Sequence, residues 1–521
     1  MLDQPTYPEF GNIYPGDYYP DIPWEEYINP RQPLPEGKIF DIRDWGAKPE
    51  EHLLNTEAIA ACCRACGEAG GGVILVEGGC YVTGTVRLPS NCTLFIAHGS
   101  ALKASRDVEQ LLTHDGSYTD DRKGESVQGA LLLIDHAARV RVTGGGKICG
   151  SGEWYVYEPR QKPALTPFPM TMLPRRDQVK EINTVPGSVR TFYRDRIRYS
   201  EDKYGEGKPD LRRPSAMVWV QESREVVFGN IILEASMSWT LHVDRCDHVT
   251  VRDVVINDNR HVANADGIDL GATSHALVEH CFVSCADDGI VLKNPGFSGR
   301  AMEDITVRRC TVLTVMNAFK IGTETGSDIR HVWVEDCDFL LEDIYPGSVS
   351  GISLESCDGT VLEDVTIRHI RMDQVVCPLY IALNRRNRYR RPCTEDPEDR
   401  YWGGHIRHVT VEDVTAKNCE LPCIITGYES ALPGEITVRR ALEDITVRNL
   451  TMVYRDNEEK LFLPEKVDEL LFDYPESNAY GDVPACGVYA RHVDGLTLTG
   501  LSVTPRRMNT RPDVALEDVR N

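Results

Sequence analysis

The sequence predicts an all-β protein built as a parallel β-helix, a solenoid of stacked coils. A six-residue strand pattern with apolar residues at its first, third and sixth places begins at Val249, Ala276, Ile305, Val332, Val365, Val409, Ile445 and Leu496. Successive starts are 27, 29, 27, 33, 44, 36 and 51 residues apart, so the early repeats are nearly constant and the later ones carry long insertions. A near-constant period of short, β-branched strands without helices between them is typical of a solenoid.

Alternation along each strand predicts which side chains face the interior. The first and third residues should point inward and the second outward. The sixth place should begin the next inward-facing segment, so Cys281, Cys310 and Cys337 are expected to form an internal ladder. A β-propeller is the structural alternative, but it should show longer strands and tight hairpin turns such as Asn-Gly.

The N-terminal part of the chain predicts a cap on this solenoid. Asn55 is predicted to cap a helix over residues 56–69 that ends at three glycines, and short strands follow at 73–76, 81–88 and 93–96. Residues 1–35 are rich in proline, tyrosine and acidic residues, which indicates an extended arm on the surface. We therefore expect an arm over 1–35 and a single parallel β-helix domain over 36–521.

Composition and charge restrict the partners. The chain has 521 residues, with 57 basic and 80 acidic side chains and a net charge of −23, which argues against nucleic acid and anionic membranes. We see no secretory signal and no membrane-spanning run, and the 17 cysteines lack metal-type spacing. A cytoplasmic protein with reduced cysteines and neither metal nor cofactor is expected. A homo-oligomer is left open.

Four aspartates stand out in the stretch N-A-D-G-I-D to C-A-D-D-G-I. They are Asp266, Asp269, Asp287 and Asp288, and one apolar strand separates the two groups. If that spacing is one coil, Asp266 and the Asp287–Asp288 pair lie on one face. Carboxylates in different environments are what acid–base hydrolysis of a glycoside needs. Asp-Gly and Asn-Asp also form turns, and we favour that interpretation for Asp269.

Residues 153–215 interrupt the repeat with many aromatic and arginine residues. A loop of this length in a compact solenoid is usually functional or disordered, and the aromatics make disorder less fitting. We expect a groove-lining wall over the face that carries the aspartates; a dimer contact is the alternative.

The aspartate motifs resemble those of glycoside hydrolase family 28, the polygalacturonase and rhamnogalacturonase group. Further resemblance lies in the segments at 40–48, at 144–154 and at 238–243, and together these motifs cover roughly 38–510. The resemblance implies a right-handed parallel β-helix and hydrolysis with inversion. It also implies that Asp287 is the general acid, and that Asp266 and Asp288 hold and activate the water. An inverting enzyme needs its acid and base about 6.5–9.5 Å apart, and repulsion within such a cluster would raise one pKa.

Two motifs of the family are replaced. Where its polygalacturonases carry Gly-His-Gly, this sequence has Met316–Thr325, with Asn317 in the place of the histidine. Where they carry Arg-Ile-Lys, Ser353 and Glu355 stand here, and Glu355 would repel a uronate. The sugar is therefore expected to be different, or to be a uronate held in another way.

Other residues are candidates for sugar contacts. Lys320 is expected beside Asn317, and five arginines fall within 385–391, with Arg385 nearest the strand end. Arginine binds carboxylates bidentately, although these arginines could instead pair with the acidic residues just downstream. His242, Trp239 and Tyr380 are further candidates, for which a buried core role is the equal alternative.

We therefore expect an exo-acting glycosidase on pectin-type oligosaccharides containing galacturonate or rhamnose, with the insertions closing one end of the groove. One alternative is a polysaccharide lyase or epimerase on the same scaffold, in which the aspartates bind Ca²⁺. The other is a carbohydrate-binding β-helix without catalysis.

Overall fold

The computed structural model describes residues 23–113, 126–155, 202–203, 212–259, 262–340, 348–386, 404–432, 436–455, 467–505 and 510–521. The chain forms two compact units, each described by itself. Unit 1 consists of Met1–Pro163, Leu173–Asp269 and Val278–Asp287, and unit 2 of Ala164–Met172, Leu270–Leu277 and Asp288–Asn521. Strands dominate both, which confirms the predicted all-β class. Within the described ranges, no helix has the length and apolar character needed to cross a bilayer.

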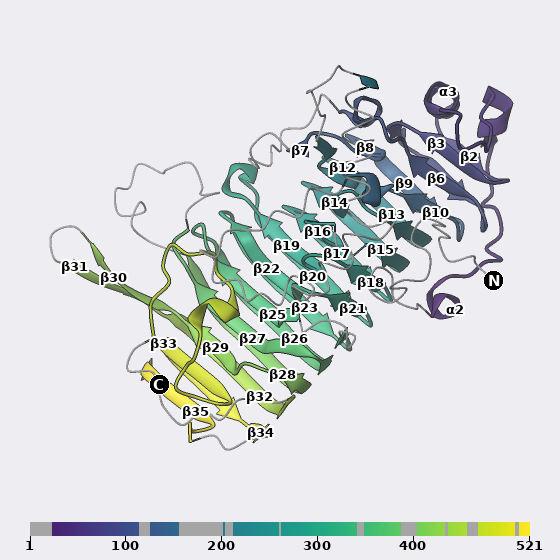
Figure 1. The fold of residues 1–521 in the computed structure, drawn as a ribbon. Helices are drawn as coiled ribbons and strands as arrows, with labels where there is room; N and C mark the ends of the chain where they lie inside the picture. The colour runs from purple at the N-terminus through teal and green to yellow at the C-terminus, as the bar shows by residue number, and fades with distance from the viewer. Residues whose placement is uncertain are drawn as a thin grey trace. The chain divides into compact units, whose positions relative to one another are not determined.

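Unit 1 begins with helices and short strands and continues with longer strands (Figure 1). Its helices are α2 (Trp24–Tyr27), η2 (Ile42–Trp45), α3 (Thr56–Glu68), η3 (Val108–Leu111) and η4 (Gly152–Tyr155). Its strands are β1 (Ile39–Asp41), β2 (Gly72–Val76), β3 (Cys80–Thr83), β4 (Val86–Arg87), β5 (Cys92–Ile96), β6 (Ala101–Ala104), β7 (Ser126–Val127), β8 (Leu132–Asp135), β9 (Ala138–Thr143), β10 (Lys147–Cys149), β11 (Arg213–Pro214), β12 (Ala216–Gln221), β13 (Arg224–Glu234), β14 (Trp239–Asp244), β15 (Asp247–Asn257) and β18 (Phe282–Cys285). Along the chain, β16 (Ile268–Gly271) and β17 (Ser274–Glu279) belong partly to each unit.

The strands of unit 1 pair in parallel with the equivalent strand of the next coil. One stack runs β2, β5, β9, β13, β15 and β18. A second runs β8, β12 and β14, and a third runs β3, β6, β10 and β13. Parallel neighbours need a connection that returns the chain to the start of the next strand, and here the other strands of the coil supply it.

Unit 2 repeats this arrangement. Its strands are β19 (Ile290–Asn294), β20 (Met302–Arg308), β21 (Thr311–Thr314), β22 (Asn317–Thr325), β23 (Ile329–Glu335), β24 (Asp338–Leu340), β25 (Ser348–Ser356), β26 (Val361–Asp373), β27 (Val375–Leu383), β28 (His405–Cys419), β29 (Cys423–Thr426), β30 (Tyr428–Leu432), β31 (Ile436–Arg440), β32 (Leu442–Tyr454), β33 (Val488–Thr499), β34 (Ser502–Thr504) and β35 (Val514–Arg520), with short helices η6 (Gly296–Ser298) and η8 (Ser477–Tyr480). One parallel stack runs β20, β23, β26, β28, β32 and β33. Another runs β19, β22, β25, β27, β29 and β33. Only β30 and β31 form an antiparallel pair among the described strands of this unit.

A residue with positive φ stands at each end of the repeated strand. Before the strand these residues are His248, His275, Asp304, His331, Asp364, His408, Asp444 and Gly495, and at its fifth place they are Asp253, His280, Arg309, Asp336, His369, Asp413, Asn449 and Gly500. Asp, Asn, His and Gly adopt this left-handed conformation more readily than other residues. The turn at the fifth place explains why the sixth side chain again faces the interior.

The inward orientation predicted for the sixth places is confirmed, whereas the stacking of all three cysteines in one ladder stays a prediction. Cys281, Cys310 and Cys337 are each at most 1% exposed. A hydrogen bond with Cys310, together with burial, raises the pKa of the Cys337 thiol well above its ordinary value. These cysteines therefore act as small apolar core residues.

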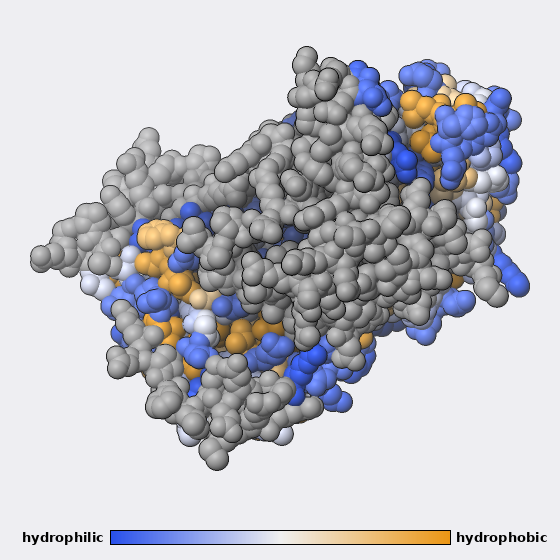
Figure 2. All heavy atoms as spheres, in the orientation of Figure 1, coloured by the Kyte–Doolittle hydropathy of each residue, from blue (hydrophilic) through white to orange (hydrophobic). Residues whose placement is uncertain are grey.

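The N-terminal helix is also confirmed, with one correction. Helix α3 buries Ile59 and three cysteines against the first strands, and in Figure 2 the surface over α3 mixes hydrophobic and hydrophilic residues. Asn55 stands at the N-cap position, but its side chain makes no capping hydrogen bond. It bonds instead to Lys48, Leu53 and Val82, and so ties the preceding loop to β3.

Two long segments remain largely untested. Residues 1–22 and most of 153–215 lie outside the described residues, so the surface arm and the groove-lining wall stay predictions. The described end of the arm packs on unit 1. The Tyr27 ring stacks on His280 with 4.9 Å between centroids, and Asn29 N–H donates to Asn230 at 2.6 Å.

Candidate active site

Asp266 and Asp287 are brought together in unit 1 by backbone hydrogen bonds. The carbonyl of Ala265 accepts from the N–H groups of Ala286, at 3.0 Å, and of Asp287, at 3.2 Å. The carbonyl of Asp266 accepts from Thr240 N–H on β14 at 2.9 Å. The loop after β15 is therefore fixed to the residues that follow β18, and Asp266 is only 3% exposed.

A buried arginine supports this pair. Arg213, fully buried, donates to the carbonyls of Met237, at 3.1 Å, and of Ala263, and to Asn264 Oδ1 at 3.0 Å. Asn264 in turn donates from Nδ2 to Asp287 Oδ2 at 3.2 Å. Arg213 thus positions the Asp287 carboxylate through one intermediate side chain. Sequence reasoning missed it because it lies at the end of the non-repetitive insertion.

The two carboxylates are close together. An oxygen of Asp266 lies within 4.8 Å of an oxygen of Asp287. This limit refers to the nearest oxygen of each residue, whereas the roughly 6.5–9.5 Å of an inverting glycosidase separates the two carboxyl groups as a whole. Two carboxylates at this distance can pass a proton to a bound substrate, or share a cation through hard oxygen ligands.

Trp239 and His242 lie together on β14, but in the interior. The His242 ring stacks on Trp219 with 5.7 Å between centroids and meets the edge of Trp239 at 4.8 Å. Both predicted residues are about 95% buried, His242 being 4% and Trp239 5% exposed. The structure thus places them in packed aromatic contacts, and their predicted role in sugar binding stays a prediction.

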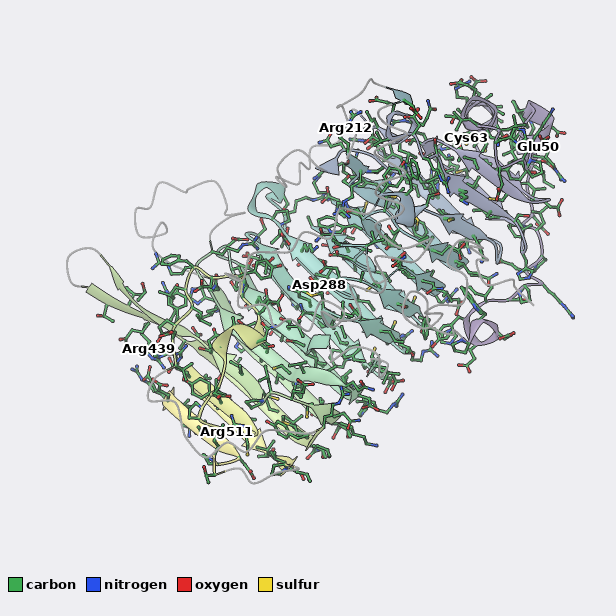
Figure 3. All side chains as sticks on the ribbon, in the orientation of Figure 1. Glu50, Cys63, Arg212, Asp288, Arg439 and Arg511 are labelled. Carbon is green, nitrogen blue, oxygen red and sulfur yellow. The ribbon has the colours of Figure 1, made fainter. Side chains whose placement is uncertain are left out.

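In unit 2, Asp288 belongs to a buried polar group that we name the Lys320 cluster (Figure 3 labels Asp288). Its members are Asp288, Asn317, Lys320, Glu355 and Glu476, and each is at most 5% exposed. Lys320 Nζ lies 3.4 Å from Asp288, 3.4 Å from Glu476 and 3.7 Å from Glu355. Asn317 Nδ2 donates to Asp288 Oδ1 at 2.8 Å.

Burial sets the protonation of the glutamates in this cluster. Desolvation raises the pKa of Glu355 to about 8 against the opposing effect of Lys320. It raises the pKa of Glu476 to about 7, again opposed by Lys320. Glu355 also accepts a hydrogen bond from Ser353 Oγ at 2.6 Å. A raised pKa favours the uncharged form of Glu355, and this weakens the repulsion of a uronate that was predicted for it.

Glycine is required next to Glu355. Gly322 on β22 has φ +143°, and a Cβ there would lie 2.6 Å from Glu355 Oε2. Only a residue without a side chain lets the carboxyl approach the strand this closely.

Glu476 reaches the cluster on a segment that sequence analysis overlooked. The described part from Val467 to Tyr480 lies within the 51-residue step, the longest between repeats. It has no strand periodicity, but it concentrates aromatic and acidic residues in D-Y-P-E-S-N-A-Y at 473–480. An unusually long insertion with that composition is the signal that could have identified it.

The same segment covers Arg385 and Arg386. Arg385 donates from Nη1 to Ser430 Oγ at 2.9 Å and lies over the Phe472 ring at 5.7 Å, while Arg386 lies over the Tyr474 ring at 5.0 Å. Arg385 Nε and Arg386 Nη1 are buried and have no hydrogen-bond partner among the described residues. Hydrophobic surface appears in Figure 2 where Figure 1 draws β29, β30 and β33 of this unit. The rest of the arginine cluster, from 387 onward, lies outside the described residues.

Tyr380 is placed in the core of unit 2. It is 1% exposed and meets Tyr480 edge-on, with 6.1 Å between ring centroids. It belongs to an apolar cluster with Cys377, Ile424 and Tyr489. A role in sugar binding therefore stays a prediction for Tyr380 as well.

Comparison with known proteins shows which family the chain is similar to. The model of the family described as Glycosyl hydrolases family 28 matches residues 198–425. A protein of Vitis vinifera described as a probable polygalacturonase is 22% identical over 357 residues, which cover 66% of this chain and 62% of that relative. The chain thus spans less than two thirds of the length of that relative.

Two solved structures share the fold at low identity. The family 28 exopolygalacturonase of Yersinia enterocolitica has a TM-score of 0.66 at 15% identity, covering 93% of this chain and 78% of that one. PfbA, a surface adhesin of Streptococcus pneumoniae, has a TM-score of 0.54 at 11% identity, covering 92% and 94%. An enzyme and an adhesin thus share the fold, so the argument for function depends on the site.

Proposed function

We propose that this protein hydrolyses glycosidic bonds in pectin-type oligosaccharides, because residues 198–425 match the model of glycosyl hydrolases family 28. The observation that carries the proposal is the approach of Asp266 and Asp287 within 4.8 Å, with Asp287 held through Asn264 and Arg213. We propose also that the parallel coils wind as a right-handed β-helix, which the likeness to the Yersinia exopolygalacturonase supports.

The proposed mechanism uses the three aspartates in different roles. Asp287 donates its proton to the leaving oxygen as the bond from that oxygen to the anomeric carbon breaks. A water attacks the anomeric carbon, and Asp266 or Asp288 takes the proton that the water loses. The product is then inverted. The anomeric form of the first product tests this stereochemical outcome.

We propose that Arg385 and Arg386 bind a carboxylate group of the substrate. Their unpartnered Nε and Nη1 groups retain donor capacity that bidentate binding of a uronate would use. Aromatic rings at Phe472, which is 68% exposed, and Tyr474, 42% exposed, offer faces beside them. The other predicted sugar contacts, Asn317 and Lys320, would act from below this surface because both are fully buried.

Exo action and a cytoplasmic location belong to the same proposal. The insertions would restrict the enzyme to chain ends, and short imported oligosaccharides would be its substrates. Fractionation of the producing cells would test the location, and the size distribution of products would test the exo mode.

The test is a product assay on homogalacturonan, rhamnogalacturonan and neutral oligosaccharides, with the anomeric form of the first product followed by NMR. Wild type should release an inverted monosaccharide. Asp287→Asn should lower kcat by about 10³-fold or more, because removal of a general acid costs at least the 10²–10⁴-fold that such groups contribute.

Asp253→Asn is the matched control for that variant. Asp253 lies in unit 1 and pairs with His280 at 2.7 Å, outside the carboxylate pair, so activity should be retained. Release of unsaturated sugars would indicate a lyase, and loss of activity in a chelator would indicate a cation between the carboxylates. Binding without turnover that survives Asp287→Asn would indicate a binding protein.

A further inference from the structure

The Lys320 cluster contains more negative charge than its single cation can balance. Full ionisation of Asp288, Glu355 and Glu476 would leave two uncompensated negative charges beside Lys320, all of them buried. An uncompensated buried charge is costly, and carboxyls in this situation take up protons instead. The cluster must therefore hold one or two protons on its glutamates near neutral pH.

Glu476 and Glu355 differ in what they contact. Glu476 accepts from Asn317 Nδ2 at 3.4 and 3.5 Å and from Lys320 Nζ at 3.4 Å. These are the same two donors that hold Asp288, at 2.8 and 3.4 Å. Glu355, by contrast, shares only Lys320 with Asp288 and bonds to Ser353. Glu476 therefore competes with Asp288 for both of its donors.

We propose that Glu476 is a positioning residue for Asp288, and that its protonation releases Asn317 and Lys320 to hold the Asp288 carboxylate in place. This inference rests on the proposed function, in which Asp288 helps to activate water. When Glu476 is neutral, both donors act mainly on Asp288. When Glu476 ionises, it attracts the same donors and repels Asp288.

Several groups on different elements face Glu476. Lys320 and Asn317 come from β22, Asp288 from the residues before β19, and Glu355 from β25. Tyr474, on the same segment as Glu476, places its ring 5.5 Å from Lys320 Nζ. Lys320 is the cation that Glu476 shares with Asp288, so ionised Glu476 draws Lys320 away from Asp288.

The test compares pH–rate profiles of wild type, Glu476→Gln and Glu476→Asp. Wild type should lose activity above about pH 7 as Glu476 ionises, which agrees with a pKa of about 7 for this group. Glu476→Gln is neutral at every pH, so its alkaline limb should move up by at least one pH unit. Glu476→Asp keeps a titrating carboxyl and should keep the limb.

Glu420→Gln is the matched control, because burial also raises the pKa of Glu420, in the loop between β28 and β29. Its profile should equal that of wild type. A second readout does not need activity. The Tm of wild type minus the Tm of Glu476→Gln should decrease as the pH rises from 5 to 8. This decrease should be smaller when both proteins also carry Asp288→Asn.

The outcomes separate the two proposals. An alkaline limb that is the same in wild type and Glu476→Gln, with a constant difference in Tm, would overturn the role of Glu476. If wild type hydrolyses no oligosaccharide of the panel, the proposed function fails. The pH dependence of the difference in Tm then supports the coupling of Glu476 to Asp288 if it is present, and refutes it if it is absent.

Discussion

Lys320 shows how much one side chain can determine. Its ammonium lies within 3.7 Å of three carboxyl groups in the interior of unit 2, and their charges raise its pKa well above the ordinary value against the effect of burial. A shared cation of this kind favours one arrangement of the three carboxyl groups, because each of them is paired with it.

Replacement of Lys320 by methionine should therefore destabilise the protein, and more at high pH. The pKa values of Glu355 and Glu476 lie above their ordinary 4.5, at about 8 and about 7. Their stabilising effect is complete below pH 4.5 and is lost as the pH rises through 7 and 8. Without Lys320, we expect a loss of about 3 kcal/mol at pH 8 and clearly less at pH 5.

Urea unfolding at the two pH values measures this difference. Lys147→Met is the control, because Lys147 pairs with Glu234 at 3.1 Å, outside the Lys320 cluster. A loss for Lys320→Met that is equal at pH 5 and pH 8 would contradict the shared charge balance.

The sequence identified Lys320, Asn317 and Glu355 as candidate site residues, but it did not predict which groups surround them. Their positions followed from the repeat, which sets residues side by side on neighbouring coils, as Lys320 and Ser353 are paired here. Asn317 and Lys320 contact Glu476, which is 156 residues beyond Lys320 and lies on a segment without periodicity. No local pattern predicts such a long-range contact.

At the scale of the element, the left-handed residues on either side of each strand also form columns of charge. In unit 2, His331 lies 3.2 Å from Asp304 and 3.7 Å from Asp364, and His408 lies 3.2 Å from Asp364 and 3.5 Å from Asp444. Acidic and histidine side chains alternate from coil to coil. Alternation keeps carboxylates from standing next to each other in the column.

His331→Asp should break this alternation without disturbing the backbone, because aspartate also adopts positive φ readily. Three consecutive carboxylates would repel, and since the side chains are about half exposed, we expect a loss of only about 0.5–1 kcal/mol. Thermal melting in low and high salt measures it. His331→Asn, which adds no charge, should be close to wild type, and high salt should reduce the difference between the two variants.

The repeated element was also the part that sequence predicted best. Apolar residues at the first, third and sixth places became buried strands, and the histidine, aspartate or glycine before each strand marks a turn that can now be read in advance. The strand expected over 81–88 was wrong as one piece. It is divided into β3 and β4 at Gly84, where a Cβ would lie 2.3 Å from the Gln110 carbonyl.

For the whole molecule, the net charge of −23 does not reveal that several basic side chains are buried in the interior. Arg213, Lys320 and Arg491 are fully buried in a chain with 57 basic and 80 acidic residues. Arg491 donates to the carbonyls of Val467 and Asp468 and so fixes the beginning of the segment that carries Glu476. Composition alone predicted that an acidic substrate would need a local basic patch. It did not predict that several cationic side chains would bind groups within the protein.

The buried cysteines also make the chain a set of natural probes. Fifteen of the 16 described thiols are buried and Cys80 is half-buried, and they are spread from α3 to the loop before β33. Desolvation raises the pKa of Cys63 and of Cys246 to about 12, so native thiolates are scarce at pH 8. An alkylating reagent should therefore label the cysteines of each coil only when that coil unfolds. Peptide mass spectrometry of the labelled protein would then give the order in which the coils unfold.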